Sequence, residues 1–134
     1  MKGVWNGSCH CGAVRFRVET EVKETTSCDC SLCSRKNAVM LQVHHTGMTI
    51  LAGQDQLGLY QWNTGVARHH FCNVCGIYTF HRKRSVPDAF GVNIFCLEGF
   101  DRMGVPHRQA DGRTMTVESA DPRPQWTGPR KPLS

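Results

Sequence analysis

Apolar and polar residues alternate along much of this chain, which is the pattern of half-buried β-strands. Val14, Phe16 and Val18 alternate with Arg15 and Arg17, and a period of two places the apolar side chains on one face of a strand. Six further runs are rich in β-branched and aromatic residues and predict strands in the ranges 39–44, 48–51, 57–62, 67–71, 77–80 and 90–97.

Turn residues separate these runs and indicate how they connect. Asn63, Thr64 and Gly65 lie between the runs 57–62 and 67–71, which predicts a hairpin with a short turn. The only weakly helical stretch is 34–37, directly after Cys33. Short strands with Gly and Asn between them predict a mainly β fold built from small antiparallel sheets, or a small sandwich.

The chain length and its last segment indicate one domain followed by a tail. A chain of 134 residues supports a single hydrophobic core. We expect the domain to occupy residues 1–120, followed by a proline-rich tail at 121–134. Prolines in this tail remove backbone donors, which predicts an extended segment over the fold or in solvent. Trp126 is its one candidate anchor.

Composition and charge exclude some classes of protein but do not select a function. The 40% hydrophobic content is that of a globular domain, and no apolar run approaches the ~18 residues that a membrane helix needs. The N-terminus has no secretory signal pattern, so we expect a cytoplasmic protein. The formal net charge is +5, and it includes the triplet Arg82-Lys83-Arg84. A basic surface attracts nucleic acid and anionic small molecules alike, or is simply solvated.

Cysteine spacing carries the most chemical information in this sequence. In a reducing compartment, clustered thiols are metal ligands more often than disulfides. Seven of the eight cysteines fall into three motifs, and Cys96 stands apart in an apolar run, where we expect a small buried hydrophobe. The motifs are Cys9-His10-Cys11-Gly12, Cys28-Asp29-Cys30-Ser31-Leu32-Cys33 and Cys72-Asn73-Val74-Cys75-Gly76.

Seven motif cysteines divide into one set of four and one set of three. The Cys-x-x-Cys-Gly motif is half of a zinc site, and the Cys-x-Cys motif can supply the other half. We therefore predict a closed structural zinc site from the cysteines at 9, 11, 72 and 75. The cysteines at 28, 30 and 33 would hold a second zinc with one position open, as catalytic zinc sites have. Alternatively, a fourth ligand closes this second site; the candidates are His10, Asp29, His44 and His69.

The sequence resembles the glutathione-dependent formaldehyde-activating family, which includes centromere protein V. The resemblance lies in the order of these three motifs, followed by an apolar strand and by Phe90-Gly91-Val92-Asn93. The similarity spans residues 3 to 100. The resemblance implies a fold of small antiparallel sheets held by zinc, often called the β-tent. It also implies the same division of ligands, with Cys9, Cys11, Cys72 and Cys75 at the structural zinc and Cys28, Cys30 and Cys33 at the catalytic zinc.

The family implies a carbon–sulfur lyase that joins glutathione to formaldehyde reversibly. Zinc with an open position can bind a thiol as thiolate. Three thiolate ligands weaken its Lewis acidity, so we expect thiol capture rather than carbonyl activation. Glutathione carries two carboxylates, and Arg35 and Lys36 are the candidate residues to bind them; otherwise they are a solvent-facing pair. His69 and His70 must point to opposite faces of a strand, so at most one faces this site.

Two other classes of function remain possible from the sequence. A non-catalytic zinc module would bind nucleic acid or a protein with both zinc sites closed. A redox enzyme resembling the methionine sulfoxide reductases would need Cys96 as its nucleophile, and the apolar neighbours of Cys96 argue for an inert thiol. We favour the lyase acting on a small-molecule thiol, without membrane or nucleic-acid partners.

Overall fold

The computed structural model describes residues 2–29, 31–61, 67–83 and 88–110. The fold is mainly β, as predicted. A single α-helix, α1 (Ser31–Lys36), and three short 3-10 turns accompany the strands in this part of the chain. The strands are β1 (Lys2–Ser8), β2 (Arg15–Glu21), β3 (Thr25–Cys28), β4 (Met40–His44), β5 (Met48–Ala52), β6 (Leu57–Tyr60), β7 (Arg68–Cys72), β8 (Tyr78–Arg82), β9 (Ala89–Asn93) and β10 (His107–Ala110).

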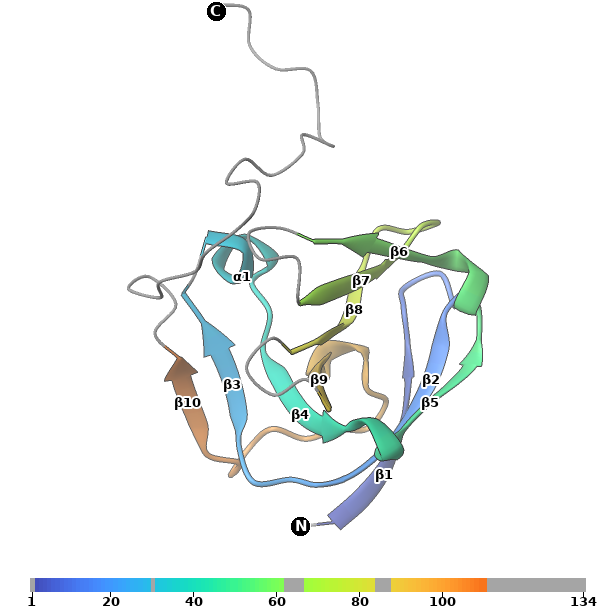
Figure 1. The fold of residues 1–134 in the computed structure, drawn as a ribbon. Helices are drawn as coiled ribbons and strands as arrows, with labels where there is room; N and C mark the ends of the chain where they lie inside the picture. The colour runs from blue at the N-terminus through green and yellow to red at the C-terminus, as the bar shows by residue number, and fades with distance from the viewer. Residues whose placement is uncertain (1, 30, 62–66, 84–87, 111–134) are drawn as a thin grey trace, which may run out of the picture.

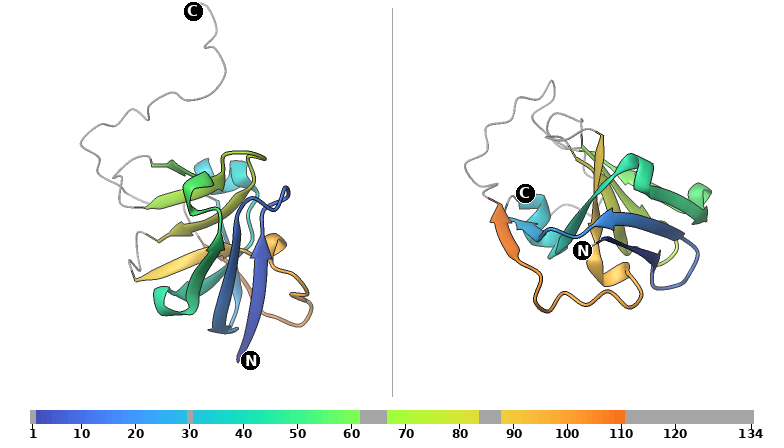
Figure 2. Two further views of the ribbon diagram at one scale, coloured as in Figure 1. Left: turned by 90° about the vertical axis from the view of Figure 1, so that its right-hand side faces the viewer. Right: turned by 90° about the horizontal axis from the view of Figure 1, so that it is seen from below.

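The strands form two sheets that face each other. β1, β2 and β5 form a three-stranded antiparallel sheet, and the others form a larger sheet in the order β10-β3-β4-β9-β8-β7-β6. The smaller sheet lies on the right of Figure 1, and α1 lies at the top. With the smaller sheet turned toward the viewer, its strands run across those of the larger sheet (Figure 2, left).

The core lies between the two sheets. The apolar face of β2 is fully buried through Phe16 and Val18, and Val14 precedes it. The Phe16 ring packs edge-to-face on Phe80 of β8, with 5.6 Å between the ring centroids, and Val92 of β9 joins the same cluster. The alternation seen in the sequence therefore forms the contact that joins the small sheet to the large one.

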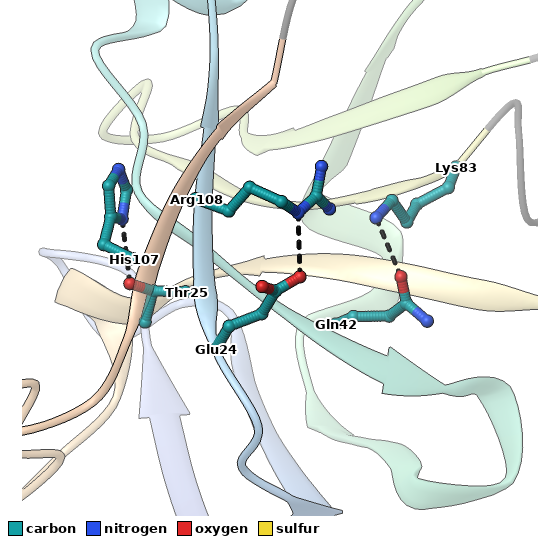
Figure 3. A network of polar contacts seen from close by, with 6 residues as sticks. All are labelled: Glu24, Thr25, Gln42, Lys83, His107 and Arg108. Carbon is teal, nitrogen blue, oxygen red and sulfur yellow. Dashed lines mark hydrogen bonds and ion pairs between the residues drawn. The ribbon is translucent and has the colours of Figure 1, made fainter.

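The far edge of the larger sheet is closed by β10, which pairs in parallel with β3. Side chains reinforce this pairing: the hydroxyl of Thr25 and Nδ1 of His107 lie 2.9 Å apart, and Arg108 Nε donates to Glu24 Oε1 at 3.0 Å (Figure 3). On a neighbouring part of the sheet, Lys83 Nζ donates to Gln42 Oε1 at 2.9 Å. Lys83 of the basic triplet is thus tied to the fold rather than extended into solvent.

Several sequence predictions need correction or lie outside the described residues. Not every strand pair is antiparallel, because β10 pairs in parallel with β3. The run 90–97 is not one strand, since the Asn93 side chain accepts from the Phe95 N–H and starts a 3-10 turn at Ile94–Cys96. The strands β1, β3 and β10 lack a strong alternation of apolar and polar residues, so the sequence did not predict them. The hairpin turn at 63–65, Arg84 and the tail 121–134 lie outside the described residues.

Truncating the contact between the sheets should destabilise the fold strongly. Phe16→Ala should lower the free energy of unfolding by about 3–5 kcal/mol, the cost of removing a buried phenyl ring. Urea unfolding measures this directly. Phe95→Ala is the matched control, since the Phe95 side chain is 62% exposed; its loss should stay under about 1 kcal/mol. Equal losses in both variants would contradict this placement of the core.

Candidate functional site

Four cysteines from two distant parts of the chain meet at one end of the core. Cys9 and Cys11 follow β1, Cys72 ends β7, and Cys75 lies in the turn before β8. Their sulfurs all lie within 4.8 Å of one another. Cys9 and Cys11 sulfurs are 3.6 Å apart, and Cys11 and Cys72 sulfurs are 3.7 Å apart. Four sulfurs at about 2.3 Å from a tetrahedral zinc would be about 3.8 Å apart, so this arrangement fits a metal ion.

The two turns that carry these cysteines have matching local structure. A glycine with positive φ follows each pair, Gly12 at 82° and Gly76 at 79°, a backbone conformation that glycine adopts without steric cost. Backbone N–H groups then point at the sulfurs: Val14 donates to Cys9 Sγ and Val74 donates to Cys72 Sγ, each at 3.3 Å. Both turns therefore direct N–H dipoles at thiolates.

The protonation of the cluster shows why it favours a cation. Backbone N–H groups of Cys11 and Ile77 lower the pKa of Cys75 to about 6. The Ala13 N–H lowers the pKa of Cys11, but burial and the three neighbouring sulfurs outweigh it and raise that pKa to about 11. Cys11 therefore resists carrying a negative charge beside the other three sulfurs. A divalent cation among them would remove this repulsion.

The second cysteine motif is described only in part. Cys28 ends β3 and is half-buried, whereas Cys33 lies in α1 and is buried. Cys30 lies outside the described residues. The three-cysteine site thus stays a prediction.

The two basic residues expected to bind carboxylates point in different directions. Arg35 is exposed at the end of α1, whereas Lys36 is half-buried. The Lys36 Nζ lies 3.0 Å from Nδ1 of His69 and 3.7 Å from the centroid of the Tyr78 ring. α1 is thereby joined to both β7 and β8.

A compact polar cluster surrounds the Lys36 ammonium. The His69 ring stacks on His81 with 4.8 Å between centroids. The Tyr78 hydroxyl lies 2.5 Å from His81 Nδ1 and donates to the Gly91 carbonyl at 3.1 Å. Burial and the Lys36 charge lower the pKa of His69 to about 3 and that of His81 to about 2, so both rings are neutral at pH 7. Tyr78 and His81 were not predicted from the sequence, although His81 is the cross-strand partner of His69.

His70 points to the opposite face from His69, as strand geometry predicted. Its ring lies 5.2 Å from that of Phe80 and lines an apolar cavity of about 560 Å³ together with residues such as Met48 and Leu57. Burial lowers the pKa of His70, and its Nδ1 is buried with no hydrogen-bond partner in the described part of the chain. Of the two histidines, His69 is the one near α1.

The other candidate ligands for the second motif lie in different settings. His10 is exposed within the first cysteine turn. His44 is exposed, and its Nε2 lies 3.3 Å from a carboxylate oxygen of Asp88. Asp29 directly follows Cys28, and its backbone N–H reaches the Ala110 carbonyl. Cys96 is buried as expected, and burial, with the charges of Cys9 and Cys75, raises its pKa to about 11, which suits an inert thiol.

Comparison with known proteins shows which family model and which solved structure this chain resembles. The family model described as glutathione-dependent formaldehyde-activating enzyme matches residues 4–110. A crystal structure of a Rhodobacter sphaeroides protein is similar to this chain at 39% sequence identity and a TM-score of 0.68, covering 77% of this chain and 99% of that one. Among the described residues, no helix has the length and hydropathy that crossing a membrane requires.

Removing one cysteine of the four should release a metal ion. Protein purified without added metal should carry a tightly held ion at these sulfurs, and Cys75→Ser should lose one ion per chain, because three thiolates bind more weakly than four. Elemental analysis of the folded fraction measures the metal, and the thermal midpoint should fall with it. Cys96→Ser is the control, since Cys96 is outside the cluster and should keep the full metal content. A Cys75→Ser protein with unchanged metal content would contradict the assignment.

Proposed function

Because the chain belongs to the glutathione-dependent formaldehyde-activating enzyme family, we propose that it is a carbon–sulfur lyase of that type. It joins a glutathione-like thiol to formaldehyde or a related small electrophile, and reverses the reaction. The observation that carries this proposal is a family match over residues 4–110, a range that contains all three cysteine motifs. Thiol chemistry suits a reducing compartment, so we propose that the protein acts in the cytoplasm.

The proposed enzyme uses two zinc ions with different duties. The cysteines at 9, 11, 72 and 75 would hold a structural zinc, a proposal supported by their sulfur spacing. Cys28, Cys30 and Cys33 would hold the second zinc, and a donor set of three thiols within six residues of sequence fits that ion. Zinc bound there would keep a substrate thiol in its thiolate form near neutral pH.

The residues of α1 and its neighbours would bind and orient the substrates. Arg35 is exposed at the last turn of the helix that carries Cys33, where its guanidinium would attract a glutathione carboxylate. Lys36, predicted to share this role, is half-buried, with Nζ 3.0 Å from His69 Nδ1. Holding the thiol beside a small aldehyde in one site lowers the barrier mainly by proximity.

The proposal is tested by catalysis of thiol–aldehyde exchange. Exchange NMR of glutathione with formaldehyde should show faster formation of S-hydroxymethylglutathione when the protein is present. Cys33→Ser should abolish the acceleration and retain one metal ion per chain, because the four-cysteine cluster remains. Cys96→Ser should keep the activity. No acceleration by a wild-type protein that carries both zinc ions would reject the lyase and favour a non-catalytic binding module.

Arg35 should affect substrate affinity more than turnover. Arg35→Gln should raise KM for glutathione about two- to fivefold, the effect of one exposed ion pair worth up to ~1 kcal/mol, and should leave kcat nearly unchanged. The effect should fade in high salt because the contact is exposed. Arg17→Gln, on the exposed face of β2, is the control. Equal KM values for the two variants would remove Arg35 from the substrate site.

A further inference from the structure

An apolar cavity of about 560 Å³ lies between the small sheet and one edge of the larger sheet. Pockets of this size hold small molecules in other proteins. The cavity is on the face of β7 that carries His70, whereas Lys36 contacts His69 on the other face. The apolar residues that line it are Met48, Ile50, Leu57, Leu59, Phe80 and Phe90. The proposed thiol chemistry makes no use of this cavity.

Two arginines lie in one row across the same face of the larger sheet. Arg68 of β7 pairs directly with Arg82 of β8, and Arg82 pairs with Phe90 of β9. His70 and Phe80 form the next pair on this face of β7 and β8, because alternate residues of a strand share a face. His70, Phe80 and Phe90 all line the cavity. The arginine row is therefore about 7 Å along the strands from residues of the cavity wall.

The arginine row carries positive charge at the margin of an apolar site. Both side chains are exposed, and like charges at directly opposite positions of two strands repel each other. Among the described residues that line the cavity, none is an Asp or a Glu. Arg82 has a further interaction of its own, so Arg68 is the better candidate for contact with a ligand. A carboxylate fits a guanidinium through two parallel hydrogen bonds, and an anion beside this row would reduce the repulsion.

The cavity and the arginine row together define the chemistry of a ligand. A molecule with an apolar body buries it against the aliphatic and aromatic side chains, and each methylene removed from water adds to the binding free energy. A negative group at one end of the molecule then meets the guanidinium of Arg68. Glutathione does not match this site, because it would place polar peptide groups against apolar side chains.

We propose that this cavity binds a free medium-chain alkyl carboxylate, with Arg68 at the carboxylate and the apolar side chains around the alkyl tail. The site uses none of the seven motif cysteines and lies on the opposite face of β7 from Lys36. It goes beyond the proposed function by giving the chain a second ligand, and it does not depend on the lyase activity.

Calorimetry of the wild-type chain with octanoate tests the charged end of the site. We expect one octanoate per chain, with butyrate bound at least tenfold more weakly because its tail is four carbons shorter. Arg68→Gln should weaken octanoate binding about three- to fivefold, the effect of one exposed ion pair, and should leave the binding of neutral octanol unchanged. Arg68→Lys should recover part of the loss. Arg17→Gln, on the exposed face of β2, is the matched control and should keep the wild-type affinity.

A second pair of variants tests the apolar end. Leu59→Trp places a larger side chain in the cavity wall at a position that is 48% exposed, so the fold should tolerate it. Octanoate binding should weaken more than tenfold. Leu51→Trp is the matched control, because Leu51 is 51% exposed and alternates along β5 with Ile50, which lines the cavity. This control should bind octanoate as the wild type does.

Any of three results would overturn the proposal. One is the absence of octanoate binding at millimolar concentration. Another is an unchanged octanoate affinity in Arg68→Gln or in Leu59→Trp. The third is loss of octanoate binding in Cys33→Ser, which would place the carboxylate at the second cysteine motif. Since octanoate binding is measured without glutathione or formaldehyde, a chain without lyase activity can still bind octanoate, and a chain that fails to bind it can still be a lyase.

Discussion

The packing of four cysteine sulfurs within 4.8 Å of one another is the constraint on which the rest of this structure depends. Two of them follow β1, and two bracket the turn between β7 and β8. Like charges at this spacing repel, so the cluster is most stable around a cation. A metal ion there would join segments 61 residues apart, from Cys11 to Cys72, in a domain with a small core.

The same turn joins the two strands that carry the polar cluster around Lys36. Cys72 ends β7, which carries His69, and Cys75 precedes β8, which carries Tyr78 and His81. A β-bulge between His70 and Phe71 adjusts the pairing of these strands. One face of the pair packs against the small sheet through Phe80, and the other face receives Lys36. The four-cysteine cluster and the polar cluster around Lys36 therefore share the same pair of strands.

Much of this arrangement could be predicted from the sequence, and the rest depends on tertiary contacts. The alternation around Phe16 identified β2, and the Cys-x-Cys and Cys-x-x-Cys-Gly spacings identified the cysteines that meet. The strand β10 could not be foreseen, because His107–Ala110 has no apolar alternation and is held by parallel pairing with β3. The inward orientation of the Lys36 side chain could not be foreseen either. Position in a helix alone does not distinguish an exposed lysine from one whose side chain reaches a buried histidine.

The central claim is that seven cysteines serve two metal ions of different character. Native mass spectrometry of the wild-type chain, purified without chelator or added metal, tests it most directly. The account predicts a dominant species with two zinc ions per chain, of which mild chelation removes one before the other, because the three-cysteine site is open and the four-cysteine site is closed. A dominant species with a single zinc ion, unchanged in Cys28→Ser, would contradict the account and leave the second motif without a metal.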